Sequence, residues 1–226
     1  MKSVVGLLLF VVLVFGCKSN AKDDRIAEKK VEFNQGLTSE LKEMAEIDQV
    51  AANIPEGKYK EWSVEKWNNF KDSVFVNNQI RIEQIFNEFG FVGFDLAGEE
   101  GSTHFWLIVQ HSDHNPDFQK RVLEKMKMEV EKENANPSSY GLLVDRVKIN
   151  TGEKQIYGTQ VSYNFETGQA YSGNLLDSLT VNERRKSIGL PPLEEYLNQM
   201  TEMHFEMNKL YFLDKGISKP KLYNLE

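Results

Sequence analysis

Apolar residues recur every three or four positions through much of the chain, which is the spacing of amphipathic helices. A first helix is predicted from Thr38 or Ser39, either of which can act as its N-cap, to near Pro55. A second pattern begins at Ser63 and ends at Gly90, where glycine favours termination. That second pattern predicts one long or kinked helix.

The middle of the chain contains a glycine-rich stretch, an apolar stretch and a further helix start. The stretch GFVGFDLAGEEG is rich in glycine and predicts a loop. Residues 102–111 are apolar nearly all round, so they predict a central helix. The pair Asn115 and Pro116 then predicts the start of another helix, with asparagine as the N-cap and proline at the first helical position.

A different periodicity follows in YGLLVDRVKI and NTGEKQIYGTQVSYNFETGQAYSGNL, where valine, isoleucine and tyrosine alternate with polar residues. Two Thr-Gly pairs interrupt this pattern as turns. Alternation of this kind is typical of strands, so a small antiparallel β-hairpin or sheet is predicted near residues 144–175.

Two further helices are predicted near the C-terminus. Thr180 and Glu183 have the spacing of a capping box, and Gly189 is the expected stop. The last helix begins at residues 191–192, and its leucine, tyrosine and methionine stripe is expected to be core. The predicted fold class is therefore mainly α (α+β), a helical domain with a small hairpin.

The N-terminus has the pattern of an export signal. Lys2 precedes an apolar stretch from Val4 to Phe15, which is shorter than the roughly 20 residues that span a bilayer. The run ends in LVFGC and resembles the lipobox of bacterial lipoproteins, in which the cysteine is lipidated. Cys17 is the only cysteine of the chain, so it is the expected lipidation site, with palmitate among the acyl groups. The alternative is a plain signal peptide followed by a stray buried cysteine.

These features predict three parts: a signal peptide over residues 1–16, a lipidated cysteine with a flexible tether over 17–36, and one globular domain over 37–226. The expected location is the cell envelope, lipid-anchored at the outer membrane and facing the periplasm or the surface, because Lys18 provides no acidic retention signal. The formal net charge is −7 and no basic stripe is present, which argues against nucleic acid as a partner.

The stretch FWLIVQHSDHNPDFQ carries the best candidate chemistry, because polar residues directly follow an apolar run. His111 and His114 are three apart, but they lie at a predicted helix junction and no further cysteine is available, so no metal site is expected. His111 with Asp113 or Asp145 could form a general acid/base pair. The structural alternative is that these side chains only satisfy helix ends and each other.

A resemblance supports a shared site. The pieces LKEMAEIDQ, WLIVQHSDHNPDFQ, LVDRVKINTGEKQIYGTQ and RRKSIGLPPLEEY, in this order, resemble an uncharacterised bacterial family of domains of unknown function. Its pattern of Asp-Gln, Gln-His-x-Asp with a downstream Phe-Gln, Asp-Arg-Val, Gln-x-Tyr-Gly-Thr-Gln and Arg-Arg-x-x-x-Gly-Leu covers roughly residues 38–199. The ligand-binding candidates within it are Gln110, His111, Asp113, Gln119, Asp145, Arg146, Tyr157, Gln160, Arg184 and Arg185.

Amides, carboxylates, guanidinium groups and one imidazole suit recognition of a polar ligand. The sequence therefore favours a membrane-anchored envelope lipoprotein that binds an unknown polar small molecule or a protein partner. The alternatives are a hydrolase-like enzyme with His111 as general base and a structural envelope protein with no ligand. No cofactor is indicated.

Overall fold

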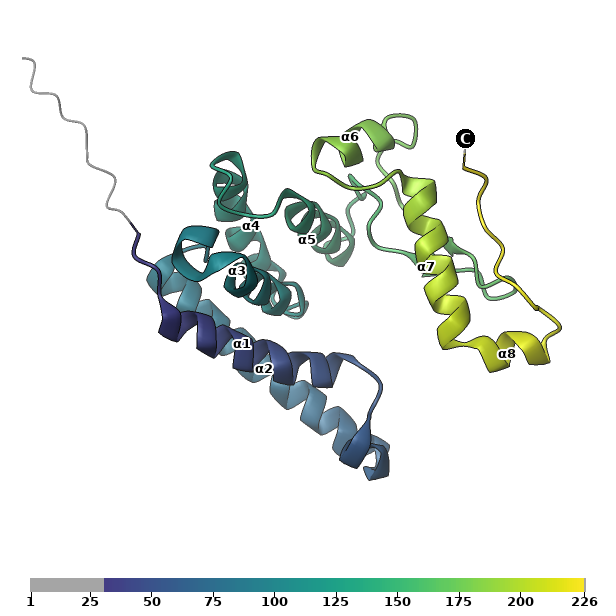
Figure 1. The fold of residues 1–226 in the computed structure, drawn as a ribbon, viewed down its shortest axis with the longest axis horizontal. Helices are drawn as coiled ribbons and strands as arrows, with labels where there is room; N and C mark the ends of the chain where they lie inside the picture. The colour runs from purple at the N-terminus through teal and green to yellow at the C-terminus, as the bar shows by residue number, and fades with distance from the viewer. Residues whose placement is uncertain (1–30, 226) are drawn as a thin grey trace, which may run out of the picture. The chain divides into compact units, whose positions relative to one another are not determined.

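The computed structural model describes residues 31–225, and Cys17 with the expected signal peptide lies outside them. This part of the chain is mainly helical (Figure 1). None of its helices is both long enough and apolar enough to cross a membrane. The elements are α1 (Gln35–Ala52), η1 (Gly57–Glu61), α2 (Val64–Phe89), α3 (Phe94–Gln110), α4 (Pro116–Glu131), α5 (Pro137–Asn150), β1 (Ser162–Tyr163), β2 (Ala170–Tyr171), α6 (Val181–Ser187), α7 (Leu193–Met207) and α8 (Lys209–Asp214).

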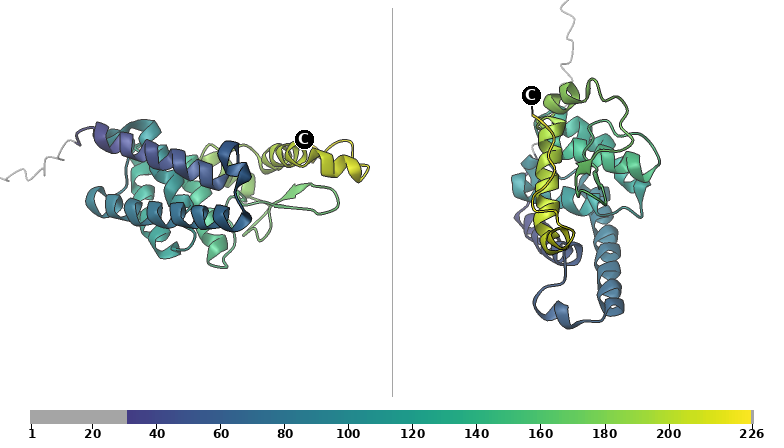
Figure 2. Two further views of the ribbon diagram at one scale, coloured as in Figure 1. Left: turned by 90° about the horizontal axis from the view of Figure 1, so that it is seen from below. Right: turned by 90° about the vertical axis from the view of Figure 1, so that its right-hand side faces the viewer.

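Helices α1 and α2 run side by side, as Figures 1 and 2 both show. α1 begins earlier than expected, because the side chain of Asn34, and not of Thr38 or Ser39, accepts a hydrogen bond from Leu37 N at 3.0 Å. α2 matches its prediction as one long helix. Ser63 caps its start, and Gly90 follows its end with a φ of 77°.

The glycine-rich segment predicted as a loop is mostly helical. α3 begins at Phe94 and continues to Gln110, with a kink at Gly98, where φ is 70°. Glycine at this position permits the left-handed turn without the strain that a Cβ would add. The glycine content of this stretch predicts a loop, and that prediction is wrong, because the stretch forms the first two turns of the central helix.

Helix α4 starts as predicted, with Asn115 accepting from Phe118 N at 3.1 Å and Pro116 in the first turn. The prediction of strand in residues 144–150 is wrong, because this segment belongs to α5. Asn136 caps α5, with proline at the next position, as at the start of α4. The apolar residues of α5 alternate only in part, and their helical spacing is the one used in the core.

The predicted hairpin is present within a shorter range. β1 and β2 pair antiparallel, with Ser162 opposite Tyr171 and Tyr163 opposite Ala170. The second Thr-Gly pair forms the turn between them, while the first follows the end of α5. Figure 2 shows the hairpin beside α7, with which β2 is in contact.

The C-terminal helices correct two further expectations. Thr180 precedes α6 but makes no capping bond there, because its hydroxyl donates to Asp177, so the predicted capping box does not form. The methionine stripe is not all core, since the side chains of Met207 and Leu210 are 67% and 85% exposed. Gly189 follows the end of α6 as expected, with a φ of 75°.

Two hydrophobic clusters hold the described residues together. The larger lies among α1 to α5, and the smaller lies between β2, α6 and α7. α5 connects them: Ser138 in its first turn donates to Ile188 O at 2.7 Å, just beyond α6. The polar residues singled out by sequence lie on and around this connection.

Candidate functional site

A surface pocket opens beside the junction of α3 and α4 and has a volume of about 510 Å³. Three of its residues are sequence candidates: His111, Asp113 and Arg146. The pocket thus combines an imidazole, a carboxylate and a guanidinium with apolar neighbours. Its full lining is Asp72, Phe75, Val76, His111, Asp113, His114 and Arg146.

His111 is held by a buried carboxylate from α1. Its Nδ1 lies 2.5 Å from Oδ2 of Asp48, whose side chain is 0% exposed. The ring of Phe75 packs against the imidazole, with a centroid distance of 5.7 Å and an interplanar angle of 67°. His111 Nε2 makes no hydrogen bond with any residue of the described part, and the side chain is 17% exposed. This arrangement fixes the imidazole from behind and leaves its second nitrogen available.

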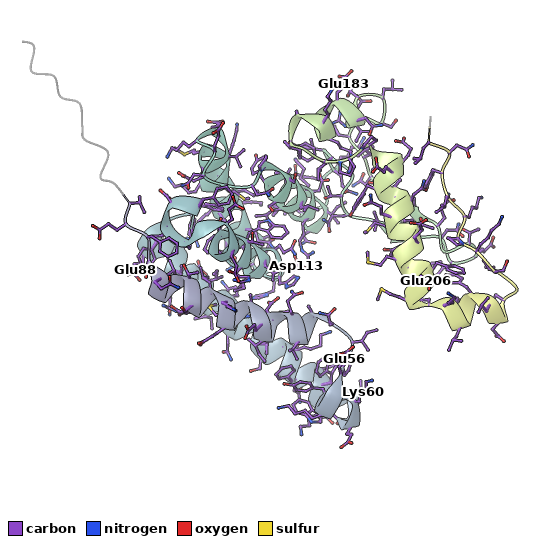
Figure 3. All side chains as sticks on the ribbon, in the orientation of Figure 1. Glu56, Lys60, Glu88, Asp113, Glu183 and Glu206 are labelled. Atoms are coloured by element: carbon purple, nitrogen blue, oxygen red, sulfur yellow. The ribbon has the colours of Figure 1, made fainter. Side chains whose placement is uncertain are left out.

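Asp113, labelled in Figure 3, is clamped by two residues of α5. Arg146 donates to it through Nε at 2.7 Å and Nη2 at 2.6 Å, and Asn150 donates at 2.8 Å. Burial raises the pKa of Asp113, but the bonds and charge of Arg146, with Asn150, outweigh it and hold that pKa below its usual range. Asp113 therefore stays ionised at neutral pH, which argues against it as a general acid.

Gln119 supports the junction from inside and does not line the pocket. It is fully buried, and its Nε2 donates to the carbonyls of Val109 and Gln110 at 3.0 and 3.2 Å. Those carbonyls belong to the last turn of α3, where helical partners are missing. The Gln110 side chain is partly buried and does not line the pocket. Gln119 Nε2 also lies 3.4 Å from Asp113 Oδ1 as a donor, so it touches the pocket only through that carboxylate.

Asp145 has a different environment from its neighbour Arg146. It is 0% exposed and accepts backbone hydrogen bonds from Ile156 at 2.7 Å, Tyr157 at 3.1 Å and Thr159 at 2.8 Å. The Thr159 hydroxyl adds a fourth donor at 3.0 Å. Asp145 therefore fixes the loop that follows α5 and has no position from which to meet a ligand.

The two arginines of α6 hold the same loop. Arg184 donates to Ile156 O at 2.7 Å, and Arg185 donates to Tyr157 O at 2.7 Å. Arg185 is completely buried, with its guanidinium 4.9 Å from the ring centroid of Tyr196. Burial lowers the pKa of Arg185, although the nearby Tyr196 and Asp145 oppose that shift. Neither arginine lines the His111 pocket.

Gln160 closes the loop through its backbone. Its N–H donates to Oε1 of the buried Gln155 at 2.8 Å, while Gln155 Nε2 donates back to Gln160 O at 2.9 Å. Between them Gly158 has a φ of 70°, and a Cβ there would lie 2.9 Å from Ser172 Oγ. Glycine is required at this turn on both counts.

The ten sequence candidates thus separate into three groups. His111, Asp113 and Arg146 meet at the pocket, while Asp145, Tyr157, Gln160, Arg184 and Arg185 form an internal network that joins α5 to α6, and Gln110 and Gln119 lie at the end of α3. His114 is exposed at the pocket rim.

The ligand-binding candidates do not include Asp48, Phe75 or Asn150, although Asp48 belongs to the Asp-Gln motif of the family-like pattern. Asp48 carries a signal that could have identified it. Leu41, Ala45 and Asp48 share one face of α1, and the first two are buried, so a carboxylate there must be paired inside. Nothing in the local sequence of Phe75 or Asn150 distinguishes them from ordinary helical positions.

Among residues 31–225, no group of three or more His, Cys, Asp and Glu side chains is arranged to hold a metal ion. His104 illustrates the spacing problem, because it lies two turns before His111 on α3 and its Nδ1 is buried without a partner.

Residues 35–207 match the model of a family of unknown function, DUF6624. The match spans most of the chain and includes all three groups, so the protein belongs to this family. No curated protein and no solved structure gives a significant match.

Proposed function

For this member of the DUF6624 family, we propose that the pocket around His111 binds a small polar ligand. The observation that carries the proposal is the pairing of His111 with the buried Asp48 at 2.5 Å, at the edge of a pocket of about 510 Å³. Small-molecule sites have volumes of this order and combine apolar walls with a few oriented polar groups.

The polar groups of the pocket complement one another. The imidazole offers one free nitrogen, and Asp113 offers a fixed carboxylate with a depressed pKa. Arg146 uses Nε and Nη2 on Asp113, which leaves Nη1 for another acceptor. A ligand that carries both a hydrogen-bond donor and an anionic or carbonyl acceptor fits this set. Phe75 and Val76 supply the apolar wall.

Ligand-dependent thermal unfolding tests the proposal. The probes are defined panels of amino acids, dicarboxylates, sugars and phosphate monoesters. We expect at least one class to raise the melting temperature of the parent, and His111→Gln and Arg146→Gln to abolish that rise. His104→Gln is the matched control, because it changes a histidine of α3 that does not line the pocket. A panel without any shift, or a shift indifferent to His111→Gln, contradicts the proposal.

A second candidate function is hydrolysis with His111 as general base. It is favoured by the same short Asp48 contact, because a carboxylate on Nδ1 fixes the tautomer that leaves Nε2 as proton acceptor. With p-nitrophenyl acetate as probe, the parent should show hydrolysis that His111→Gln removes. Asp48→Asn should retain the fold and lower the rate by about 10²–10⁴-fold, the range typical of general-base effects. Equal rates in parent and His111→Gln would eliminate this candidate.

We also propose that the domain is held at the cell envelope, at the outer membrane, through a lipid on Cys17. Support comes from the sequence LVFGC after a short apolar run, and from the presence of a single cysteine. Cys17→Ser should either release the protein as a soluble species or leave an uncleaved precursor. Fractionation of cells with an antibody measures this, and a variant processed and retained like the parent would refute it.

A further inference from the structure

A second pocket lies between the β-hairpin and the α7–α8 corner, near the labelled Glu206 at the end of α7 (Figure 3). It has a volume of about 470 Å³ and shares no residue with the His111 pocket. Its distinguishing feature is the number of aromatic rings. The lining consists of Ser162, Tyr163, Asn164, Phe165, Tyr171, His204, Tyr211 and Phe212.

Four of these rings form a continuous chain with changing orientation. Tyr163 stacks on His204 with centroids 3.9 Å apart and an interplanar angle of 17°. His204 meets Phe212 edge-on at 5.6 Å and 74°, and Phe212 meets Tyr211 at 5.4 Å and 73°. Successive rings therefore do not form one flat stack, and their faces are turned in different directions around the corner.

The fifth ring, that of Phe165, is exposed to solvent on an ordered turn. The side chain of Phe165 is 92% exposed, although the turn around it is fixed. Asn164 Oδ1 accepts from the backbone N–H groups of Glu166 and Thr167, each at 2.9 Å, and Gly168 N donates to Asn164 O at 2.8 Å. A large aromatic side chain kept exposed on an ordered turn is available for contact with a ligand.

The pocket lining carries no formal positive charge. No lysine or arginine lines it among the described residues, and burial lowers the pKa of His204, which keeps that imidazole neutral at pH 7. A lysine of the chain nevertheless lies beside one of its rings. The ammonium group of the exposed Lys215 lies 4.5 Å from the centroid of the Tyr211 ring. The Tyr211 ring thus already receives an ammonium group from the chain itself.

We propose that this aromatic pocket binds a small organic ammonium cation, of the trimethylammonium class. The negative faces of aromatic rings attract such cations, and several rings around one cation are the usual means of recognising quaternary ammonium groups. An anion fits less well, because no lysine or arginine is among the residues that line the pocket. The negative net charge of −7 also favours approach of a cation over an anion.

Choline and its neutral isostere 3,3-dimethylbutan-1-ol provide a direct test. Both have the same shape, and only choline carries a charge. In calorimetric and NMR titrations of the full chain, choline should bind saturably at one site, and the alcohol should bind at least about tenfold more weakly if cation–π attraction dominates. Equal affinity for the two probes, or no saturable binding of choline, overturns the proposal.

Three variants assign the binding to this pocket. Tyr211→Leu should weaken choline binding by about three- to tenfold through the loss of one ring face. Lys215→Gln should strengthen it, because the variant removes a positive charge that lies beside the Tyr211 ring. Tyr59→Leu is the matched control, since Lys58 lies over that ring at 5.1 Å and the ring is outside the pocket.

Circular dichroism must show that each variant is folded; Tyr211 is half exposed, so the leucine variant is expected to fold. Choline affinity unchanged by Tyr211→Leu, or lowered equally by Tyr59→Leu, contradicts the assignment. His111→Gln should leave choline binding intact, which separates this result from the fate of the His111 pocket.

Discussion

Replacing Asp145 by alanine tests whether the internal network stabilises the fold. The substitution removes the acceptor of three backbone N–H groups and the Thr159 hydroxyl. Each donor left buried without a partner costs about 1–3 kcal/mol, so the three amides alone predict about 3 kcal/mol at the lower end. The buried Arg185 also loses a nearby negative charge. We therefore expect Asp145→Ala to lower the free energy of unfolding by about 3–5 kcal/mol, from the four donors left without their acceptor.

Urea unfolding followed by tryptophan fluorescence and circular dichroism measures this loss. The midpoint should shift strongly while the slope with denaturant stays constant, since the same surface is exposed on unfolding. Asp113→Ala is the matched control. It also removes an aspartate that accepts several hydrogen bonds, but Asp113 is exposed at the pocket. Exposed ion pairs contribute about 0–1 kcal/mol, so the control should change stability little.

The reasoning fails if Asp145→Ala costs less than about 1 kcal/mol, a value typical of an average substitution. It also fails if Asp113→Ala costs as much as Asp145→Ala. Either result would mean that the loop after α5 relaxes without its carboxylate, and that the network joining α5 to α6 contributes little to the fold.

His111→Ala should cost about 1–3 kcal/mol in urea unfolding because it strands the buried carboxylate of its partner, while His114→Ala should change stability by less than about 0.5 kcal/mol. Stoichiometric zinc in the purified protein, lost from both histidine variants, would contradict the view of a metal-free pocket. Gly158→Ala should cost about 1–2 kcal/mol more than Gly152→Ala, because both have φ near 70–76° but only Gly158 would place a Cβ against neighbouring atoms; equal losses would refute the steric argument. The depressed pKa of Asp113 adds stability that is present above its unfolded value of about 3.9 and disappears as the pH falls through the folded pKa. Asp113→Asn should therefore flatten the acid side of the stability profile, as unfolding midpoints between about pH 2 and pH 5 would show, and an unchanged profile would contradict it.

Local signals predicted most of the helices, and their failures have local causes. An Asn-Pro pair begins both α4 and α5, but it predicts only the start of α4. In α5 the valine and isoleucine residues alternate in part like those of a strand, and this pattern favours the wrong structure. β-branched residues favour strands only as a tendency, and burial against neighbouring helices decided this segment. Glycine content misled the expectation at α3, where Gly98 serves as a kink inside a helix.

The pocket was predictable only in part because its key contact spans distant segments. Asp48 and His111 are 63 residues apart and meet through the packing of α1 on α3. Periodicity places each residue on a face of its own helix, but it does not say which helices pack together. The family-like motifs indicated which residues matter without indicating which of them are near one another.

The Asp-Arg pair of α5 shows how neighbours in sequence acquire different roles. Consecutive residues of an α-helix are about 100° apart around its axis, so Asp145 can face the buried loop while Arg146 faces the pocket. The sequence candidates therefore resemble one site although they lie in separate places of the fold. Asp145→Asn and Arg146→Gln separate them: the first should lower stability and leave any ligand response of the folded protein intact, and the second should do the reverse. If both variants lose the ligand response while folded, the network and the pocket act as one unit, and the division between them is wrong.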